Sequence, residues 1–153
     1  MLLQVISLLC FSTSIYADFN GQVVGVADGD TLTVVREQRQ VRVRLLEIDA
    51  PEKTQAFGRK SKQSLSEPCF GKMAHLAEKG KDRYGRTLAR VTCEGIDANA
   101  EQVRRGMAWV YDRYVTDQSL YQLQNNAKAA HIGLWRDAKP LPPWEWRKEK
   151  RND

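Results

Sequence analysis

The sequence contains few of the residues that build soft-metal or redox centres, and it has no apolar run long enough to cross a membrane. Three cysteines and two histidines occur among its 153 residues. His75 and His131 lack the spacing of zinc ligands, which counts against a thiolate metal centre. The apolar run at residues 2–11 is short, whereas a transmembrane helix needs about 20 apolar residues. No internal repeat and no second domain can be recognised in a chain of this length.

Charge is absent from the first seventeen residues. Residues 2–11 are apolar, and residues 12–17 are mostly small or polar and end at Ala17. This arrangement resembles a secretory signal peptide cleaved after Ala17, although no lysine or arginine precedes the apolar run. A buried N-terminal strand is the alternative. We therefore expect residues 1–17 to be a signal peptide and the mature chain to be exported, to the periplasm or to the medium.

Acidic residues are outnumbered in this chain. Lys and Arg total 24 against 19 Asp and Glu, so the formal net charge is +5 and the pI is about 9.2. A positive balance suits a polyanionic partner such as nucleic acid, or an anionic surface. Charge alone does not identify the partner, because many basic secreted proteins bind no nucleic acid.

Cys69 and Cys93 remain after the predicted cleavage. An even number of cysteines in an exported chain indicates a disulfide. Antiparallel pairing of residues 69–76 with residues 87–93, about a turn near residue 81, brings the two cysteines opposite each other. A two-thiol metal site is the alternative, but neither histidine has the spacing to complete it.

Five short segments are rich in β-branched and apolar residues, and three longer segments are typical of helices. The predicted strands cover residues 19–27, 31–36, 40–46, 69–76 and 87–93. The predicted helices cover residues 57–65, 97–106 and 116–132. Strands in meander order with helices inserted late favour a small closed sheet, so we expect an OB-type, five-stranded barrel with three helices in residues 18–136.

The C-terminal tail, residues 137–153, contains three prolines and several lysines and arginines. We expect this tail to be a partly ordered extension, with Trp144 and Trp146 docking on the body. Nothing in the sequence indicates an assembly larger than a monomer.

Acidic and basic side chains gather at one end of the predicted hairpin. Pairing residues 31–36 with residues 40–46 about a turn at 37–39 places Asp30 opposite a residue near Glu47, give or take two. Asp49 then lies within a few residues of Asp30 across the ladder, where facing positions are roughly 5 Å apart. Two carboxylates with Arg44 and Glu52 nearby predict a hard-cation site that handles phosphate.

Three stretches of the chain resemble the signature sequences of the staphylococcal (micrococcal) nuclease family. They are Asp-Gly-Asp-Thr at 28–31, Arg-Leu-Leu-Glu-Ile-Asp-Ala-Pro-Glu at 44–52 and Asp-Arg-Tyr-Gly-Arg at 82–86. Later matches fall at residues 99–106 and 133–135, so the resemblance covers roughly residues 21–135. It implies an OB-type barrel and a Ca²⁺-dependent phosphodiesterase that cuts DNA and RNA to leave a 5′-hydroxyl and a 3′-phosphate.

The resemblance implies a metal site formed by Asp30, Asp49 and the backbone carbonyl of Ala50. The family commonly has threonine at the last position. A carbonyl ligand survives that change, whereas a hydroxyl contact is lost.

The resemblance also implies three catalytic residues. Arg44 and Arg86 match the two arginines that clamp the phosphate, a task suited to the planar, permanently charged guanidinium group. Glu52 matches the carboxylate that positions or deprotonates the attacking water. The sequence does not decide between these two roles of Glu52.

Substrate contacts are implied at Arg83, Tyr84 and Tyr114. Tyr114 matches one of two tyrosines that line the nucleotide pocket, and the other falls on Asp112, which is a departure from the family. Tyr111 could compensate from the neighbouring position. The tyrosines have an alternative role in packing at the edge of the core.

A nuclease is the leading interpretation, with DNA and RNA as substrates and Ca²⁺ as cofactor. The alternative is a non-catalytic nucleic-acid-binding module of the OB type, which uses the same face without hydrolysis. Such modules usually lack one or more of the acidic or clamping residues, and this chain keeps them.

Overall fold

The computed structural model describes residues 17–152. The predicted signal peptide lies outside the described residues apart from Ala17. The elements in chain order are β1 (Phe19–Val26), β2 (Thr31–Arg36), β3 (Arg39–Leu45), β4 (Ile48–Asp49), α1 (Gly58–Cys69), β5 (Met73–Lys81), β6 (Thr87–Cys93), β7 (Ile96–Asp97), α2 (Ala98–Arg104), β8 (Trp109–Val110), α3 (Ser119–Ala129), the 3₁₀ helix η1 (Gly133–Arg136) and α4 (Pro143–Asn152).

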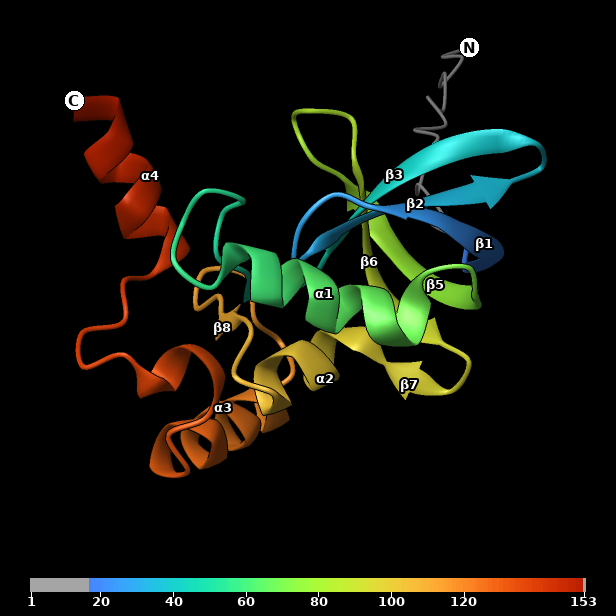
Figure 1. Cartoon of the computed structure of the whole chain (residues 1–153). Helices are drawn as coiled ribbons and strands as arrows, with labels where there is room; N and C mark the ends of the chain where they lie inside the picture. The colour runs from blue at the N-terminus through green and yellow to red at the C-terminus, as the bar shows by residue number, and fades with distance from the viewer. Residues whose placement is uncertain (1–16, 153) are drawn as a thin grey trace, which may run out of the picture.

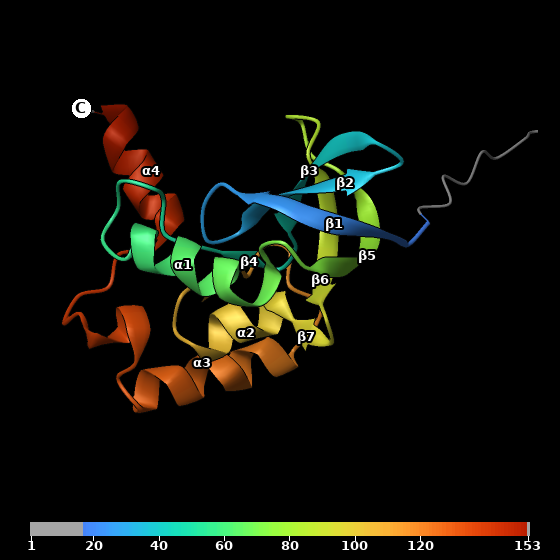
Figure 2. The same ribbon diagram turned by 45° about the vertical axis from the view of Figure 1, so that its right-hand side comes forward.

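The five long strands form a mixed β-barrel. Their order is β3-β2-β1-β5-β6, all neighbours in this order are antiparallel, and a parallel pairing of β3 with β6 closes the sheet. β7 extends the β6 edge, and β4 pairs separately with β8. Helices α1, α2 and α3 lie together on one side of the barrel, while α4 stands apart from it (Figures 1 and 2). The predicted barrel is confirmed, and α4 adds a fourth helix to the three that were expected.

The core fills the barrel and continues beneath the helices. Inward positions of the strands alternate with exposed ones, as in β1, where every second residue from Phe19 to Val23 is buried. Burying each Val or Leu side chain contributes roughly 1.5–3 kcal/mol relative to leaving it in water. Completely buried side chains come from both layers: Val23, Leu32, Val34, Val43, Leu76 and Val91 from the strands, and Leu65, Val103 and Leu120 from α1, α2 and α3.

The β2–β3 hairpin fixes the position of the acidic residues. Its turn is Glu37-Gln38, one residue shorter than expected, and both residues have a positive φ of 48° and 64°. Such backbone matches the twist of a two-residue hairpin. The register pairs Thr31 with Arg44, and Leu45 donates its N–H to the Asp30 carbonyl at 2.8 Å. Asp30 is therefore opposite Leu45, within the predicted two residues of Glu47.

The predicted disulfide between Cys69 and Cys93 is present, with its Cα atoms 5.2 Å apart, but the strand register used to predict it is wrong. Cys69 ends α1 rather than starting a strand, and β5 pairs Ala74 with Cys93. The bridge thus fastens the end of a helix to a barrel strand.

Helix α1 also runs past its predicted end, through Pro68. Proline removes the hydrogen bond to the carbonyl four residues earlier, which here belongs to Ser64. The Arg105 guanidinium donates to that carbonyl at 3.4 Å. A tertiary contact therefore satisfies the group that proline leaves free, and one further turn of helix forms.

The other two predicted helices are confirmed with shorter boundaries. Asp97 caps α2 by accepting the Ala100 N–H at 3.0 Å, as expected. The start of α3 moves from residue 116 to Ser119, because the Thr116 and Asp117 N–H groups donate to Glu47 instead. Its end moves back to Ala129, and the chain turns with positive φ at His131 and Gly133.

The C-terminal tail is more ordered than expected. Residues Pro143–Asn152 form α4, and the Glu145 and Trp146 N–H groups both donate to the Pro142 carbonyl. The prediction that Trp144 docks is confirmed, because its ring stacks on Tyr111 with centroids 5.5 Å apart. Among residues 17–152, no helix has the length and apolarity needed to cross a membrane.

Candidate active site

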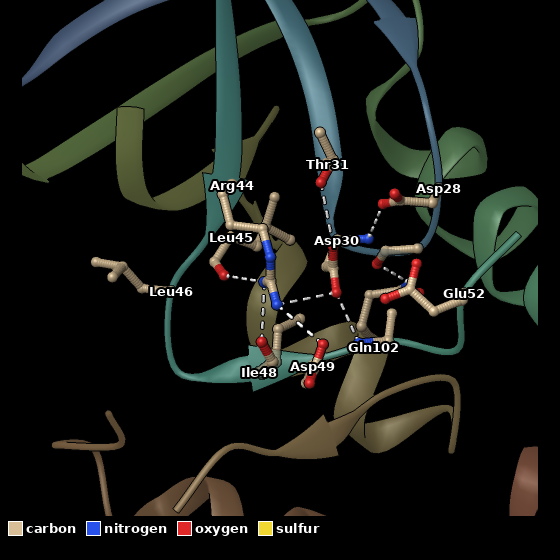
Figure 3. Close-up of polar contacts among 12 residues, drawn as sticks. Asp28, Asp30, Thr31, Arg44, Leu45, Leu46, Ile48, Asp49, Glu52 and Gln102 are labelled. Carbon is tan, nitrogen blue, oxygen red and sulfur yellow. Dashed lines mark hydrogen bonds and ion pairs between the residues drawn. The ribbon is translucent and has the colours of Figure 1, made fainter. Parts of the chain in front are cut away.

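Two buried aspartates meet where the β1–β2 loop lies against β4 (Figure 3). Asp30 precedes β2 and is 5% exposed, and Asp49 ends β4 and is 1% exposed. The Ala50 N–H donates to Asp30 Oδ2 at 2.7 Å and ties the two segments together. Pairing of β4 with β8 holds Asp49 opposite Trp109.

Arg44 bridges the two aspartates. Its Nη2 lies 3.0 Å from Asp49 Oδ1 and 3.2 Å from Asp30 Oδ2, so these two oxygens are at most about 6 Å apart. Its Nη1 donates to the Leu45 and Ile48 carbonyls at 2.7 and 2.9 Å. The guanidinium is therefore fixed by backbone as well as by charge (Figure 3).

Residues of helices α1 and α2 support the loop that carries Asp30. Gly29 packs so tightly that a β-carbon there would collide with the Ser61 side chain and come within 2.8 Å of the Ala50 Cβ. Gln102 of α2 is 1% exposed, and its Nε2 donates to the Gly29 carbonyl at 2.6 Å and to the Ser61 carbonyl at 3.0 Å. This support was not predicted, since a glutamine on a short helix carries no signal of its partner. Only glycine fits the contact, which explains the Asp-Gly-Asp sequence.

Burial makes negative charge costly in this pocket. Burial, reinforced by the charge of Asp30, raises the pKa of Asp28 to about 6. Burial likewise raises the pKa of Asp49, although Arg147 and Arg44 both oppose the shift. Carboxylates in such surroundings are stabilised when a cation is added.

Glu52 lies in the loop after β4, with its side chain one-third exposed. Its N–H donates to Gln55 Oε1 at 3.1 Å, which shapes the bend after Pro51. Its Oε1 accepts from Arg147 Nη1 at 2.6 Å. Arg147 belongs to α4 and also reaches Asp49, a contact that no sequence motif indicated.

Arg86 lies on the turn between β5 and β6. Thr87, the next residue, pairs with Val43, the residue before Arg44, so Arg86 is held one strand away from Arg44. The Arg86 Nε donates to Asp82 Oδ2 at 2.7 Å, and Asp82 also accepts the Arg86 N–H at 2.9 Å. Asp82 thus supports the arginine from its own turn.

Arg83 and Tyr84 form an exposed tip on the same turn. The Arg83 guanidinium donates to the Tyr84 hydroxyl at 2.6 Å, and the Tyr84 ring is 68% exposed. The Arg86 guanidinium lies 5.6 Å from the centre of that ring. An exposed ring beside two arginines provides a surface on which a base and its phosphate can stack.

Tyr114 belongs to an aromatic group beside β8. Its ring is 55% exposed and meets Tyr111 edge to face, with centroids 5.2 Å apart. Tyr111 in turn stacks on Trp144. Asp112, which occupies the second tyrosine position of the family, accepts a hydrogen bond from Tyr121 at 2.6 Å. Tyr111, next to Asp112, therefore places an aromatic ring beside that of Tyr114, and its role in a nucleotide pocket stays a prediction.

The structure joins part of the predicted site by direct contact. Asp30, Asp49, Ala50 and Arg44 form one hydrogen-bonded cluster, to which Glu52 is linked through Arg147. Among residues 17–152, no ion pair or hydrogen bond connects this cluster to the side chains of Arg83, Tyr84, Arg86 or Tyr114. Arg86 remains a candidate catalytic residue, and Arg83, Tyr84 and Tyr114 remain candidate substrate contacts, around the cluster.

The donor set suits a hard cation. No group of three or more His, Cys, Asp or Glu side chains in the described part of the chain is arranged to hold a metal ion. Two buried carboxylates are nevertheless present, with oxygens no more than about 6 Å apart. Ca²⁺ binds oxygens at about 2.3–2.6 Å and accepts carbonyls and waters for the remainder of its 6–8 ligands. Asp30, Asp49 and the Ala50 carbonyl therefore fit calcium in donor type.

Fold and site together define a small β-barrel protein with an oxygen-donor cluster, bridged by an arginine, between two adjoining loops. The sequence profile described as staphylococcal nuclease homologue matches residues 42–137. The chain belongs to the staphylococcal nuclease family.

Similar proteins carry names that agree with this family. An "Uncharacterized endonuclease" of Haemophilus influenzae is 50% identical over 131 residues, covering 85% of this chain and 74% of that protein. An "Uncharacterized endonuclease" of Escherichia coli O157:H7 is 47% identical and covers 88% of each chain. A "Micrococcal nuclease" of Shigella flexneri is 39% identical, covering 94% of this chain and 89% of that protein.

Proposed function

We propose that this protein is an exported, Ca²⁺-dependent nuclease that hydrolyses phosphodiester bonds of DNA and RNA with low sequence specificity, leaving 5′-hydroxyl and 3′-phosphate ends. The observation that carries the proposal is the pair of buried aspartates bridged by the fixed guanidinium of Arg44. Membership of the staphylococcal nuclease family supports the same reaction.

In this proposal Asp30, Asp49 and the Ala50 carbonyl hold calcium, which offsets the negative charge that builds on the phosphate oxygens. Arg44 is oriented for this task before substrate arrives, because two backbone carbonyls fix its Nη1. Arg86, supported by Asp82, contacts the phosphate from the turn before β6. Because Arg44 lies on β3 and Arg86 on this turn, the two guanidinium groups can approach the phosphate from different sides.

Glu52 orients the attacking water and accepts its proton as the oxygen bonds to phosphorus. The bond from phosphorus to the 5′-oxygen breaks, and that oxygen takes a proton from solvent. The phosphate stays on the 3′-oxygen. General-base assistance of this type is typically worth about 10²–10⁴ in rate. Tyr84, Arg83 and Tyr114 offer exposed rings and charge for the bases and phosphates on either side.

A digestion assay tests the proposal. Wild-type protein should degrade single-stranded DNA, duplex DNA and RNA in CaCl₂ and should leave them intact in a calcium chelator. Glu52→Gln should lower kcat by about 10²–10⁴. Glu149→Gln, an equal change at an exposed position on α4, should not. Gel retardation without fragments in calcium would refute the nuclease and favour the non-catalytic binder.

Export is the second part of the proposal. The Cys69–Cys93 bridge persists in an oxidising compartment such as the periplasm or the medium. Residues 1–17 would act as the signal peptide, and the mature chain would be a monomer. Mass spectrometry of the mature protein should find its N-terminus at Asp18, and light scattering should find a single chain. An intact Met1 in the isolated protein would contradict the proposed cleavage.

A further inference from the structure

Arg147 lies inside the candidate active site although it comes from the C-terminal helix. Its Nη2 is 2.7 Å from Asp49 Oδ2, and its Nη1 is 3.2 Å from Asp49 Oδ1 and 2.6 Å from Glu52 Oε1. The guanidinium thus occupies both oxygens of a proposed metal ligand and one oxygen of the proposed base.

Calcium and Arg147 would have to share one carboxylate oxygen. Arg147 Nη2 lies 2.7 Å from Asp49 Oδ2, and Ca²⁺ would bind that oxygen at about 2.3–2.6 Å. A calcium ion bound there would therefore lie no more than about 5 Å from the guanidinium nitrogen. Two positive charges at that distance repel each other strongly where bulk water is excluded.

Apart from the Arg147 contacts, the helix is attached to the body through the segment before it and through its first turn. Gln55 donates to the Leu141 carbonyl at 2.7 Å, and Trp144 stacks on Tyr111. The rest of α4 extends away from the barrel (Figures 1 and 2). The Arg147 side chain remains 35% exposed, so it has a path to solvent.

We propose that Arg147 is an internal counter-ion of the metal site, which holds Asp49 and Glu52 together in the metal-free protein and leaves Asp49 when calcium binds. This inference rests on the proposed function. Calcium and Arg147 then compete for one carboxylate, so loss of the arginine strengthens calcium binding. A coupling of this type usually changes an affinity by about 5–150-fold.

Isothermal titration of the metal-free protein with CaCl₂ alone tests the competition without any substrate. Arg147→Gln should bind calcium about tenfold more tightly than wild type. Arg151→Gln, an equal charge change one helical turn farther from the site, should bind like wild type. Trp144→Ala, which loosens α4 but keeps the arginine, should also tighten binding by a smaller factor.

Equal calcium affinity in Arg147→Gln and wild type would overturn the inference, and so would weaker binding, which would make Arg147 a support of the metal ligands. If the wild type cleaves DNA in calcium, either result overturns only the proposed counter-ion role of Arg147 and leaves the nuclease proposal standing. A wild-type protein that binds no calcium and cleaves nothing overturns the proposed function as well. Circular dichroism of each variant checks that α4 and the barrel remain folded.

A separate basic groove lies next to the same acids. It has a volume of about 480 Å³ and runs between the β1–β2 loop, the loop after β4 and α1, where Lys53, Arg59 and Lys62 line it together with Asp28. Among residues 17–152, none of these three cations has an ion-pair partner. Unpaired cations around a hollow are typical of a surface that follows a nucleic-acid backbone.

Two residues that line the groove are close in sequence to residues of the acidic cluster. Asp28 is two residues from Asp30, and Lys53 follows Glu52 directly. A strand whose scissile phosphate lies at the cluster can therefore place a neighbouring phosphate in the groove. We infer that Arg59 and Lys62 bind a backbone phosphate flanking the cleaved one, which would favour long polynucleotides over short ones.

Fluorescence anisotropy with a labelled 12-nucleotide single strand in chelator tests the groove without cleavage. Arg59→Gln/Lys62→Gln should weaken binding about tenfold and lower the salt dependence of log Kd by about 0.7, because single strands lose about 0.7 per neutralised phosphate and this pair is proposed to bind one phosphate. Arg136→Gln/Lys139→Gln, an equal charge change outside the groove, should cost less affinity. Equal losses in both double variants would show that only net charge matters and would overturn the groove.

Discussion

Loss of the Cys69–Cys93 bridge should destabilise the protein by an amount that follows from its position. The bridge closes a loop of 24 residues between the end of α1 and β6. In the chain-entropy treatment, a loop of this length removes about 12 cal/mol/K from the unfolded state, or about 3.5 kcal/mol at 25 °C. Both cysteines are completely buried, so substitution by alanine adds a small packing loss.

Urea denaturation of the mature chain is the appropriate assay. Cys69→Ala/Cys93→Ala should lower the free energy of unfolding by about 3.5 kcal/mol and the Tm by roughly 12 °C, taking about 2.1 cal/mol/K per residue for the entropy of unfolding. A reducing agent should destabilise the wild type by a similar amount and leave the double variant unchanged. A loss below about 1 kcal/mol would refute the loop-entropy reasoning. It would mean that residual structure keeps Cys69 near the β6 segment in the unfolded ensemble even without the bridge.

Two further predictions concern buried acids. The pKa of Asp28 is raised to about 6 from 3.8, so its contribution to stability is complete below pH 3.8 and is lost as pH rises through 6. The free energy of unfolding of Asp28→Asn, relative to that of wild type, should therefore rise by up to about 3 kcal/mol between pH 4 and pH 8, measured in chelator. A difference in urea midpoints that does not change with pH would contradict this. Glu47 accepts the Thr116 and Asp117 N–H groups and pairs with Arg90 at 2.8 Å. Glu47→Gln should cost about 3 kcal/mol by thermal unfolding at pH 7, and a change within about 0.5 kcal/mol would show that the glutamine re-forms the network.

Local patterns predicted the parts of the fold that depend on local geometry. Runs of apolar and β-branched residues located four of the five long strands to within one residue, whereas the strand predicted at 69–76 lies at Met73–Lys81. Counting across the β2–β3 turn placed Asp30 within two residues of its partner on β3. The predicted length of that turn was wrong by one residue. Glu37 and Gln38 adopt a left-handed backbone, which their residue types do not predict.

Predictions failed where a distant group changed the local preference. Pro68 normally marks the end of a helix, but Arg105 satisfies the carbonyl that it leaves free, and α1 continues to Cys69. The cysteine pairing was right although its register was wrong, since a bridge needs only that two residues lie close together and not that both lie on strands.

The sequence by itself determined the barrel and which acidic and basic side chains gather at one end of the β2–β3 hairpin. Its strand pattern, its hairpin spacing and its arginine-flanked acidic motifs specify these features, because each depends on residues that are close along the chain or share one ladder. The tertiary structure alone decided that Arg147 reaches Asp49 across nearly a hundred residues and that α4 supplies it. Trp144 of the same helix stacks on Tyr111, and the free energy of such packing comes from the assembled surface rather than from any one segment of the chain.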